Sequence, residues 1–246
     1  MHIDKNALLC YTGSNTFWGF IGDILKYKDA EVAQFEGHYV AWRKTRIAKL
    51  ISILGEAWFQ GKTILEAGCG LGHVGEKLME LGARVTFADG RQIYLNEINK
   101  RMRFAETIYL DQDGAWDLRR KFDLIVHWGL LYHLKNWRED LESALKHSNL
   151  ISLETEVMDF DGESELKIIE THCHSGIHQI GTRPSCLMLE NYIKKLGALF
   201  ERYDDKDLNA EYFIYDWKPG ICKDNYFDGL RRFYLIRRNN PENSFV

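Results

Sequence analysis

Three closely spaced glycines follow a carboxylate in the segment ILEAGCGLGH, residues 64–73. Glycines at alternate positions after an apolar run predict a turn in which the backbone approaches a ligand. Read as GxGxxG through Gly70, Gly72 and Gly75, the motif would predict a dinucleotide whose pyrophosphate lies at a helix N-terminus. The apolar run ends just after Glu66, however, so this carboxylate is expected inside the ligand pocket. It would repel a pyrophosphate and favour a ligand with ammonium and sulfonium charges. A glycine turn that serves only strand–helix packing is the alternative.

Acidic residues also follow the next two apolar segments. Asp89 ends the segment ARVTFAD, and Asp111 and Asp113 follow ETIYL. In parallel α/β sheets, an acidic side chain at the end of the second strand hydrogen-bonds ribose hydroxyls. An acidic side chain after the third strand could accept a hydrogen bond from an adenine amino group. The sequence therefore predicts an adenosine-containing ligand, which leaves both dinucleotides and other adenosine compounds open.

Alternating strand-like and helix-like segments predict the elements that hold these residues. Apolar, strand-like runs alternate with helical patterns, which favours βαβ units and a parallel sheet. The expected strands cover 62–68, 83–89, 106–111, 122–129 and 149–157, and the expected helices cover 36–58, 73–82, 91–104, 136–147 and 185–197. Two β-rich runs at 211–217 and 230–238 predict an antiparallel hairpin. Residues 158–184 follow a strand without a regular pattern, so we expect a lid or substrate loop there.

These segments together resemble the cofactor motifs of class I S-adenosylmethionine-dependent methyltransferases. The motifs are ILEAGCGLG, VTFADGR, IYLDQD and FDLIVHWGLLYHL, and the resemblance covers residues 60–155. It implies a Rossmann-like α/β fold with a seven-stranded, mostly parallel sheet and an antiparallel C-terminal hairpin. A single domain over 1–246 would then comprise an N-terminal helical cap (1–60), a cofactor-binding half (61–157), a lid insertion (158–184) and a C-terminal helix and hairpin (185–246).

The same resemblance implies S-adenosylmethionine as the cofactor and assigns the residues that bind it. Glu66, Gly68 and Gly70 would surround the methionine part, and Asp89 would hold the ribose. The full predicted set is Glu66, Ala67, Gly68, Cys69, Gly70, His73, Asp89, Gly90, Arg91, Asp111, Gln112, Asp113, His127 and Trp128.

The fourth expected strand, FDLIVHW, ends in GLLYHL beside the expected position of the transferred methyl group. Family members that methylate adenine, cytosine or glutamine amides usually carry an N/D-P-P-Y/F motif here, which this chain lacks. It has Tyr132 and His133 instead, and we predict both as catalytic residues. An imidazole is suited to remove a hydroxyl proton near neutral pH. Alternatively, His133 caps the following helix or packs beneath the cofactor, and catalysis uses proximity alone.

A narrower resemblance joins GLLYHL to LET at 153–155 and to RPS at 183–185, before a helix that ends in glycine. It points to a subgroup that includes the tRNA wobble-uridine carboxymethyl transferase and many sugar and small-molecule O-methyltransferases. The tRNA enzyme continues with Arg-Arg-Ser-Pro after its Tyr-His, whereas this chain has LKNW. The prediction is therefore methyl transfer, by in-line displacement, to a hydroxyl of a small polar acceptor such as a sugar or nucleotide-sugar. The alternatives are a tRNA wobble-base (carboxy)methyltransferase, which would need a positive groove, and a cofactor-binding, non-catalytic partner subunit.

The predicted lid contains the histidine-rich stretch THCHSGIH at residues 171–178. Its histidines and Cys173 could gather a divalent metal with Glu154 or Glu156, and metal-assisted deprotonation of a sugar diol is sensible chemistry. The spacing H-x-H-x3-H is not that of a recognised closed site, so no metal is predicted. Arg183, fixed before a proline, could hold a phosphate or carboxylate by two hydrogen bonds, or form a surface salt bridge. The predicted substrate-binding residues are Glu154, His172, His174, His178 and Arg183.

The helix expected at 36–58 carries Trp42, Arg43 and Arg46. These side chains could roof the cofactor pocket, or they could form an exposed basic face. The sequence leaves both arrangements open.

Length, charge and composition limit the classes of function. The chain has 246 residues, which suits one α/β domain, with a net charge of −4 and a pI near 6.2. This charge gives no general attraction to nucleic acids or anionic membranes, so we expect a small-molecule substrate and no nucleic-acid or membrane partner; a homodimer is compatible with the sequence. Five scattered cysteines without CxxC spacing and the lack of a signal-peptide pattern predict a cytoplasmic protein.

Overall fold

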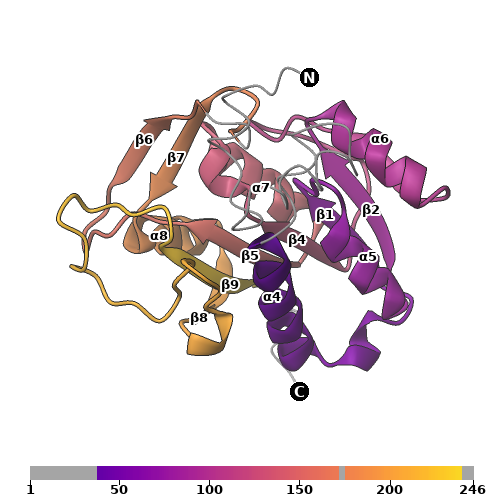
Figure 1. The fold of residues 1–246 in the computed structure, drawn as a ribbon, viewed down its shortest axis with the longest axis horizontal. Helices are drawn as coiled ribbons and strands as arrows, with labels where there is room; N and C mark the ends of the chain where they lie inside the picture. Colours follow the sequence, from indigo (N-terminus) through magenta and orange to yellow (C-terminus); the bar gives the residue numbers. More distant parts are fainter. Residues whose placement is uncertain (1–37, 172–174, 240–246) are drawn as a thin grey trace, which may run out of the picture.

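The computed structural model describes residues 38–171 and 175–239, whose strands form one seven-stranded and one two-stranded sheet. The seven strands lie in the order β3-β2-β1-β4-β5-β9-β8 (Figure 1). Pairing is parallel from β3 to β5, and β9 runs antiparallel to both β5 and β8. These strands are β1 (Thr63–Ala67), β2 (Arg84–Asp89), β3 (Glu106–Tyr109), β4 (Leu124–Trp128), β5 (Leu150–Glu156), β8 (Ala198–Tyr203) and β9 (Arg231–Arg238). The predicted Rossmann-like fold, with its mostly parallel sheet and antiparallel C-terminal hairpin, is confirmed.

Helices cover both faces of this sheet (Figure 1). One face packs against α4 (His38–Leu54), α5 (His73–Glu80) and α6 (Gln92–Arg101), and the other against α7 (Trp137–His147) and α8 (Cys186–Lys195). Successive strand residues alternate between the two layers: Ile64 and Leu124 contact the first, whereas Leu65 and Ile125 contact the second. Because both faces are buried, the central strands are apolar at nearly every position.

Short elements join these helices and strands. The helix expected at 36–58 is α4 followed by the 3₁₀ helix η1 (Glu56–Phe59), with a break at Gly55, whose φ is +83°. The 3₁₀ helix η2 (Leu131–His133) follows β4, and η3 (Lys206–Leu208) follows β8. Ser185 caps the start of α8, and its hydroxyl accepts a hydrogen bond from the backbone N–H of Met188 at 3.3 Å.

The carboxyl ends of β1, β2, β4 and β5 meet at one edge of the sheet. β1 pairs with β2 on one side and with β4 on the other, so the chain changes direction across the sheet at this point. Ligands of open α/β sheets bind outside such a switch point. Glu66, Asp89 and Trp128 lie at or next to the ends of their strands there.

The C-terminal hairpin uses a different strand from the one predicted. β9 matches the run at 230–238, but its hairpin partner is β8, directly after α8. The predicted strand at 211–217 is wrong, because this segment makes only isolated bridges, at Ala210–Phe213 and Ile214–Leu230. Its aromatic residues Tyr215 and Trp217 are buried. Alternating aromatic residues indicate that a segment is buried, but they do not distinguish a strand from a packed loop, because both can bury such side chains.

The predicted lid at 158–184 contains a hairpin of its own. β6 (Glu165–Ile169) and β7 (Ile180–Pro184) pair antiparallel and form the two-stranded sheet, where the sequence showed no regular pattern. β7 lies against η2, beside the carboxyl edge of the large sheet (Figure 1). His172, Cys173, His174 and the first part of the predicted cap lie outside the described residues. Among the helices of the described part, none has the length and apolarity needed to cross a membrane.

Candidate active site

The glycine loop between β1 and α5 requires glycine for conformation and for space. Gly68, Gly70 and Gly72 have φ angles of +62°, +51° and +71°, in the left-handed region that other residues rarely adopt. A Cβ atom at Gly68 would also lie only 2.8 Å from Cδ2 of Leu130, the second residue after β4. Gly68 and Gly70 line the cavity, so the loop backbone forms part of its wall.

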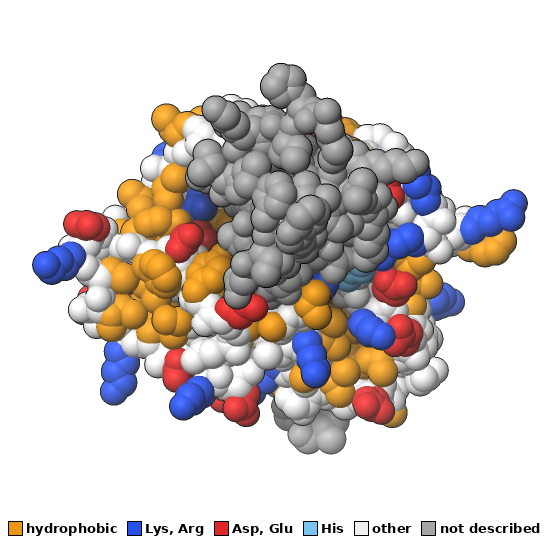
Figure 2. All heavy atoms as spheres, viewed as in Figure 1, with side chains coloured by type: hydrophobic (Ala, Val, Ile, Leu, Met, Phe, Trp, Pro, Cys, Tyr) orange, Lys and Arg blue, Asp and Glu red, His pale blue; other side chains and the backbone are white. Residues whose placement is uncertain are grey.

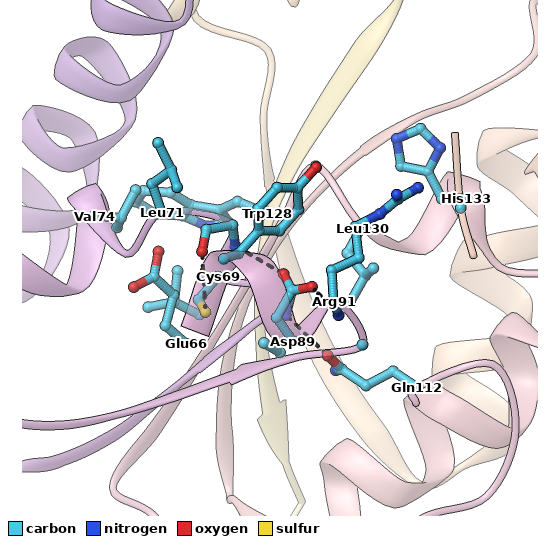
Figure 3. Close-up of a pocket in the computed structure, with 18 of the residues that line it drawn as sticks. Glu66, Cys69, Leu71, Val74, Asp89, Arg91, Gln112, Trp128, Leu130 and His133 are labelled. Atoms are coloured by element: carbon cyan, nitrogen blue, oxygen red, sulfur yellow. Dashed lines mark hydrogen bonds between the residues drawn. The ribbon is translucent and has the colours of Figure 1, made fainter. Parts of the chain in front are cut away.

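Two polar side chains hold this loop: Asp89, the last residue of β2, and Gln112, in the loop after β3. Gly70 N–H donates to Oδ2 of Asp89 at 2.9 Å, and Arg91 N–H donates to Oδ1 of the same carboxylate at 2.8 Å (Figure 3). Burial raises the pKa of Asp89 to about 6, against the lowering effect of these two hydrogen bonds. Gly68 N–H donates to Oε1 of Gln112 at 2.9 Å, while Nε2 of Gln112 is buried and has no hydrogen-bond partner among the described residues.

Glu66 lies one residue before the end of β1 and faces the first turns of α5. Its Oε2 accepts a hydrogen bond from Gly75 N–H at 2.8 Å, and a Cβ atom at Gly75 would lie 2.5 Å from that oxygen. Burial raises the pKa of Glu66 to about 8, although the Gly75 hydrogen bond and the charge of Arg43 lower it. A positively charged group bound beside such a carboxyl group lowers its pKa, and the carboxyl group then releases its proton. In Figure 3, Glu66 and His133 lie on opposite sides of Asp89.

His133, in η2, is held by a glutamate of the lid. Its Nδ1 lies 2.7 Å from Oε2 of Glu170, the residue after β6. The Glu170 carboxylate also accepts from Gly176 N–H at 2.7 Å and from Nη1 of Arg183 at 2.6 Å. Burial raises the pKa of Glu170, but the hydrogen bond and charge of His133 and the charge of Arg183 outweigh it and lower the pKa to about 2. Since a carboxylate only accepts, Nδ1 carries a proton, and in the neutral ring Nε2 has the free lone pair.

Tyr132 packs directly against His133. Their ring centroids are 4.1 Å apart, and Cζ of Arg231 lies 4.5 Å from the Tyr132 centroid. Burial raises the pKa of the Tyr132 phenol well above its usual range, and the charge of Arg231 opposes only part of this. Tyr132 therefore stays protonated at neutral pH and can donate a hydrogen bond, but it cannot act as a base.

Buried ion pairs connect the lid to the central sheet. Besides its bond to Glu170, Arg183 donates from Nε to Oε2 of Glu156 at 2.8 Å and from Nη1 to the carbonyl oxygen of Tyr132 at 3.0 Å. Nη2 of Arg231 donates to Oε1 of the same Glu156 at 3.0 Å. The side chains of this network are no more than 6% exposed, so each charge depends on its partners for compensation.

A second pair extends the network toward α4. Nη2 of Arg46 lies 3.4 Å from Oε1 of Glu154, and both side chains are fully buried. Glu154 also accepts from the Tyr215 hydroxyl and, at 3.0 Å, from Gly129 N–H. Burial lowers the pKa of Arg46 to about 9, and the charge of Glu154 opposes this. Arg46 thus stays charged at neutral pH and anchors α4 to the end of β5.

A family model described as a methyltransferase domain matches residues 39–166, more than half of the chain. The chain belongs to the class I S-adenosylmethionine-dependent methyltransferases. The match covers α4, the glycine loop and the strand ends that form the site.

Solved structures of other methyltransferases share the fold of this one. The N-terminal domain of EvdMO1, crystallised in the presence of SAH and D-fucose, is 18% identical with a TM-score of 0.60, covering 81% of this chain and 83% of that chain. Magnesium protoporphyrin IX methyltransferase (ChlM) from Synechocystis PCC 6803, with bound SAH, is 13% identical with a TM-score of 0.54, covering 92% and 90%. The glycopeptide N-methyltransferase MtfA complexed with SAM is 13% identical with a TM-score of 0.53, covering 79% and 93%. No curated protein sequence matches the chain.

One cavity of the methyltransferase gathers most of the predicted cofactor-binding and catalytic residues at the carboxyl edge of the sheet. The predicted residues that line it are Glu66, Ala67, Gly68, Cys69, Gly70, His73, Asp89, Gly90, Arg91, Asp111, Gln112, Trp128, Tyr132 and His133. Trp42 and Arg43 of α4 also line it, whereas Arg46 does not. The roof arrangement considered for this helix therefore applies to its first turns.

Two predicted cofactor-binding residues lie away from the cavity wall. Oδ1 of Asp113 accepts from Asn136 N–H at 2.6 Å and so caps the start of α7. His127 is fully buried, with Nε2 2.6 Å from Oδ2 of Asp140 in α7. Both side chains connect α7 to the sheet.

The predicted substrate-binding residues are placed differently from the expectation. Glu154 and Arg183 belong to the buried ion-pair network and do not line the cavity, and the surface salt bridge considered for Arg183 is instead a buried one. His178 is exposed, and its Nε2 lies 2.8 Å from Oδ2 of Asp111. His172 and His174 lie outside the described residues. Within residues 38–171 and 175–239, no group of three or more histidine, cysteine and acidic side chains is arranged to hold a metal ion.

Sequence reasoning missed Glu170 and Arg231, which contact the two predicted catalytic residues. It also missed the lid residues Ser175 and Ile177 at the cavity wall. The run LRRFYLIRR contained one usable signal, since two adjacent arginines at the start of an apolar strand place at least one of them in a buried layer. No comparable signal marked Glu170.

Proposed function

We propose that this methyltransferase transfers the methyl group of S-adenosylmethionine to a hydroxyl oxygen of a small polar acceptor, such as a sugar, with His133 as the general base. The observation that carries the proposal is the His133–Glu170 pair at the cavity wall, with Nδ1 of the ring 2.7 Å from the carboxylate. A hydroxyl must lose its proton as its oxygen is methylated, and an oriented neutral imidazole accepts that proton.

The residues around the glycine loop fit the cofactor. Glu66, with a pKa raised to about 8, would ionise against the ammonium group of the methionine part. Asp89, at the end of β2, would accept from the ribose hydroxyls. The unpartnered Nε2 of Gln112 would donate to a nitrogen of the adenine ring. These roles are assigned by the chemistry of the donors and acceptors that the cavity offers.

When bound, the cofactor supplies the electrophile: its carbon–sulfur bond breaks as the acceptor oxygen bonds to the methyl carbon, and S-adenosylhomocysteine remains. Nε2 of His133 takes the hydroxyl proton. Glu170, with a pKa lowered to about 2, stays ionised and compensates the positive charge that develops on the ring. Tyr132 stays protonated and would orient the acceptor oxygen by donating a hydrogen bond.

The compared structures support a range of acceptors for the fold and one of them supports a sugar. The EvdMO1 domain was crystallised in the presence of D-fucose, whereas MtfA is an N-methyltransferase and ChlM is a porphyrin methyltransferase. His133 as a general base supports a hydroxyl acceptor in this protein, because a neutral amine can attack the methyl group without first losing a proton. On the face drawn in Figure 2, the Lys and Arg side chains of the described residues are interspersed with Asp and Glu, which supports a small acceptor over tRNA.

The proposal is tested by measuring S-adenosylhomocysteine release with a panel of sugars, nucleotide-sugars and small amines. We expect turnover with hydroxyl acceptors, and His133→Asn should lower kcat by roughly 10²–10⁴-fold without changing the affinity for S-adenosylhomocysteine. Lys167→Gln, which changes an exposed side chain of β6 in the same lid that does not line the cavity, serves as the control and should keep the wild-type kcat. Methylation of amines alone, or an unchanged kcat in His133→Asn, would refute the proposal.

A further inference from the structure

Two side chains of the cavity wall carry buried N–H donors that have no acceptor in the described part of the chain. They are Nε and Nη1 of Arg231 and Nε1 of Trp42. Arg231 is 3% exposed and Trp42 is 8% exposed, so solvent reaches neither side chain freely. Native proteins satisfy nearly all of their buried donors, and an unsatisfied donor at a cavity wall is satisfied when a ligand oxygen binds.

The neighbours of Arg231 within the protein meet this need only in part: a side-chain hydrogen bond with Tyr132 raises its pKa, but Nε and Nη1 have no partner at full hydrogen-bond geometry among the described residues. Glu156 accepts a hydrogen bond only from Nη2 of Arg231, at 3.0 Å. Oε1 of Glu154 lies 4.0 Å from Nη1, which is too far for a hydrogen bond, and this carboxylate is already engaged by Arg46. Burial lowers the pKa of Arg231, but the nearby Tyr132, Glu156 and Glu154 raise it further, so the guanidinium remains charged.

During methyl transfer, the buried network has one more positive than negative charge to compensate, so one further anion would be stabilised there. The network contains three guanidinium groups and three carboxylates, which are Arg46, Arg183, Arg231, Glu154, Glu156 and Glu170. Glu170 is also the partner of His133, and it compensates the imidazolium that forms when the ring takes the acceptor's proton. Two carboxylates then face three guanidinium groups, and one negative charge on the acceptor restores the balance.

Trp42, Tyr132 and Arg231 border the same part of the cavity. A Cβ atom at Gly129 would lie 3.4 Å from the Trp42 ring and 4.0 Å from the Tyr132 hydroxyl, so both side chains reach this glycine. Cζ of Arg231 is 4.5 Å from the centroid of the Tyr132 ring, and the His133 ring centroid is 4.1 Å from the same centroid. The guanidinium and the base therefore both lie against the Tyr132 ring at the wall of one cavity, so a small bifunctional acceptor can reach both.

We propose that the methyl acceptor is a small hydroxy-carboxylate, whose carboxylate accepts hydrogen bonds from Arg231 while its hydroxyl faces His133. The inference rests on the proposed hydroxyl methylation. Nε1 of Trp42 donates to the same acceptor molecule. The charged guanidinium orients the acceptor, so that its hydroxyl end faces His133.

The test compares acids with neutral analogues that carry the same hydroxyls. Calorimetry on the protein saturated with S-adenosylhomocysteine uses D-galacturonate against D-galactose, 4-hydroxybenzoate against 4-hydroxybenzamide, and lactate against lactamide. We expect at least one acid to bind roughly ten- to a hundredfold more tightly than its neutral partner. This is the change in affinity that one hydrogen bond between charged groups contributes. Arg231→Gln should abolish this preference, and Trp42→Phe, which keeps the ring and loses the donor, should reduce it.

Arg232→Gln is the matched control for loss of a buried arginine. Arg232 is the next residue of β9, donates to the carbonyl oxygens of Tyr215 and Trp217, and does not line the cavity. This variant should keep the preference for the acid even if its melting temperature falls as far as that of Arg231→Gln.

The possible outcomes separate the two proposals. Equal binding of every acid and its neutral partner overturns the carboxylate subsite, as does methyl transfer to neutral hydroxyl compounds without preference for acids. Weakened S-adenosylhomocysteine binding in Arg231→Gln, with acid binding unchanged, would assign Arg231 to the cofactor and also overturn the subsite. Preferential acid binding that depends on Arg231, without methylation of any hydroxyl, would retain the subsite and refute hydroxyl methylation.

Discussion

Glu66 makes the stability of the ligand-free protein depend on pH. Burial raises its pKa from 4.5 to about 8, so the folded protein holds a proton that the unfolded chain releases between these pH values. The contribution of this group to stability is therefore fully present below pH 4.5 and is lost as the pH rises through 8. Converted to free energy, the difference between the two pKa values amounts to at most about 5 kcal/mol.

Glu66→Gln removes this titration and keeps a side-chain oxygen for the Gly75 N–H. Near pH 5 the variant should be about as stable as the wild type, because the wild-type carboxyl is then protonated in the folded state. At pH 9 the free energy of unfolding of the variant should exceed that of the wild type by up to about 5 kcal/mol. Urea denaturation across this pH range measures the difference.

Asp89 is present in both proteins and its pKa of about 6 lies below that of Glu66, so the difference between the two curves above pH 7 reports mainly on Glu66. Glu163→Gln, which changes an exposed glutamate, is the control and should follow the wild-type curve at every pH. The same Glu66→Gln variant should bind S-adenosylhomocysteine more weakly and without the proton release that calorimetry in two buffers detects for the wild type. Parallel pH dependence of stability in the wild type and Glu66→Gln would refute this reasoning.

Two further predictions concern packing and charge around the site. Gly75→Ala places a methyl group 2.5 Å from Oε2 of Glu66 and 2.4 Å from the Phe87 ring, so we expect a loss of about 1–3 kcal/mol in the free energy of unfolding and weaker S-adenosylhomocysteine binding. Unchanged urea and binding curves would contradict it. Arg46→Met leaves Glu154 buried without its guanidinium and should cost about 3–5 kcal/mol in urea denaturation. Adding Glu154→Gln should restore part of that loss, and a purely additive double variant would argue against the ion pair.

The cofactor half of the cavity was predictable because its residues adjoin the features that position them. Glu66 and Asp89 lie at the ends of paired parallel strands, and the glycine loop follows β1 directly. Parallel pairing brings those ends to one edge whatever the rest of the chain does. Local sequence and one topological rule therefore sufficed to gather them at one cavity.

Within this half, two single predicted positions lie away from the cavity wall. His127 and Trp128 are consecutive in β4, and strand alternation turns Trp128 to the cavity and His127 to Asp140 of α7. Asp111 and Asp113 are two apart in a loop, where no alternation applies, and only Asp111 reaches the cavity wall. A motif places the chain to within a few residues, but the local backbone decides which side chain faces the ligand.

The part of the cavity proposed to bind the acceptor could not be predicted in this way, because it joins segments that are far apart in the sequence. The lid hairpin is the clearest case: Ser175 accepts from Nη2 of Arg91 at 2.6 Å on the cofactor side, while Glu170 holds both Gly176 and His133. A displacement of the hairpin therefore alters the cavity wall at Arg91 and the orientation of His133 together. The acceptor site consequently depends on the packing of β6 and β7 against η2, which no short motif encodes and which a change in the hairpin can alter while the glycine loop stays intact.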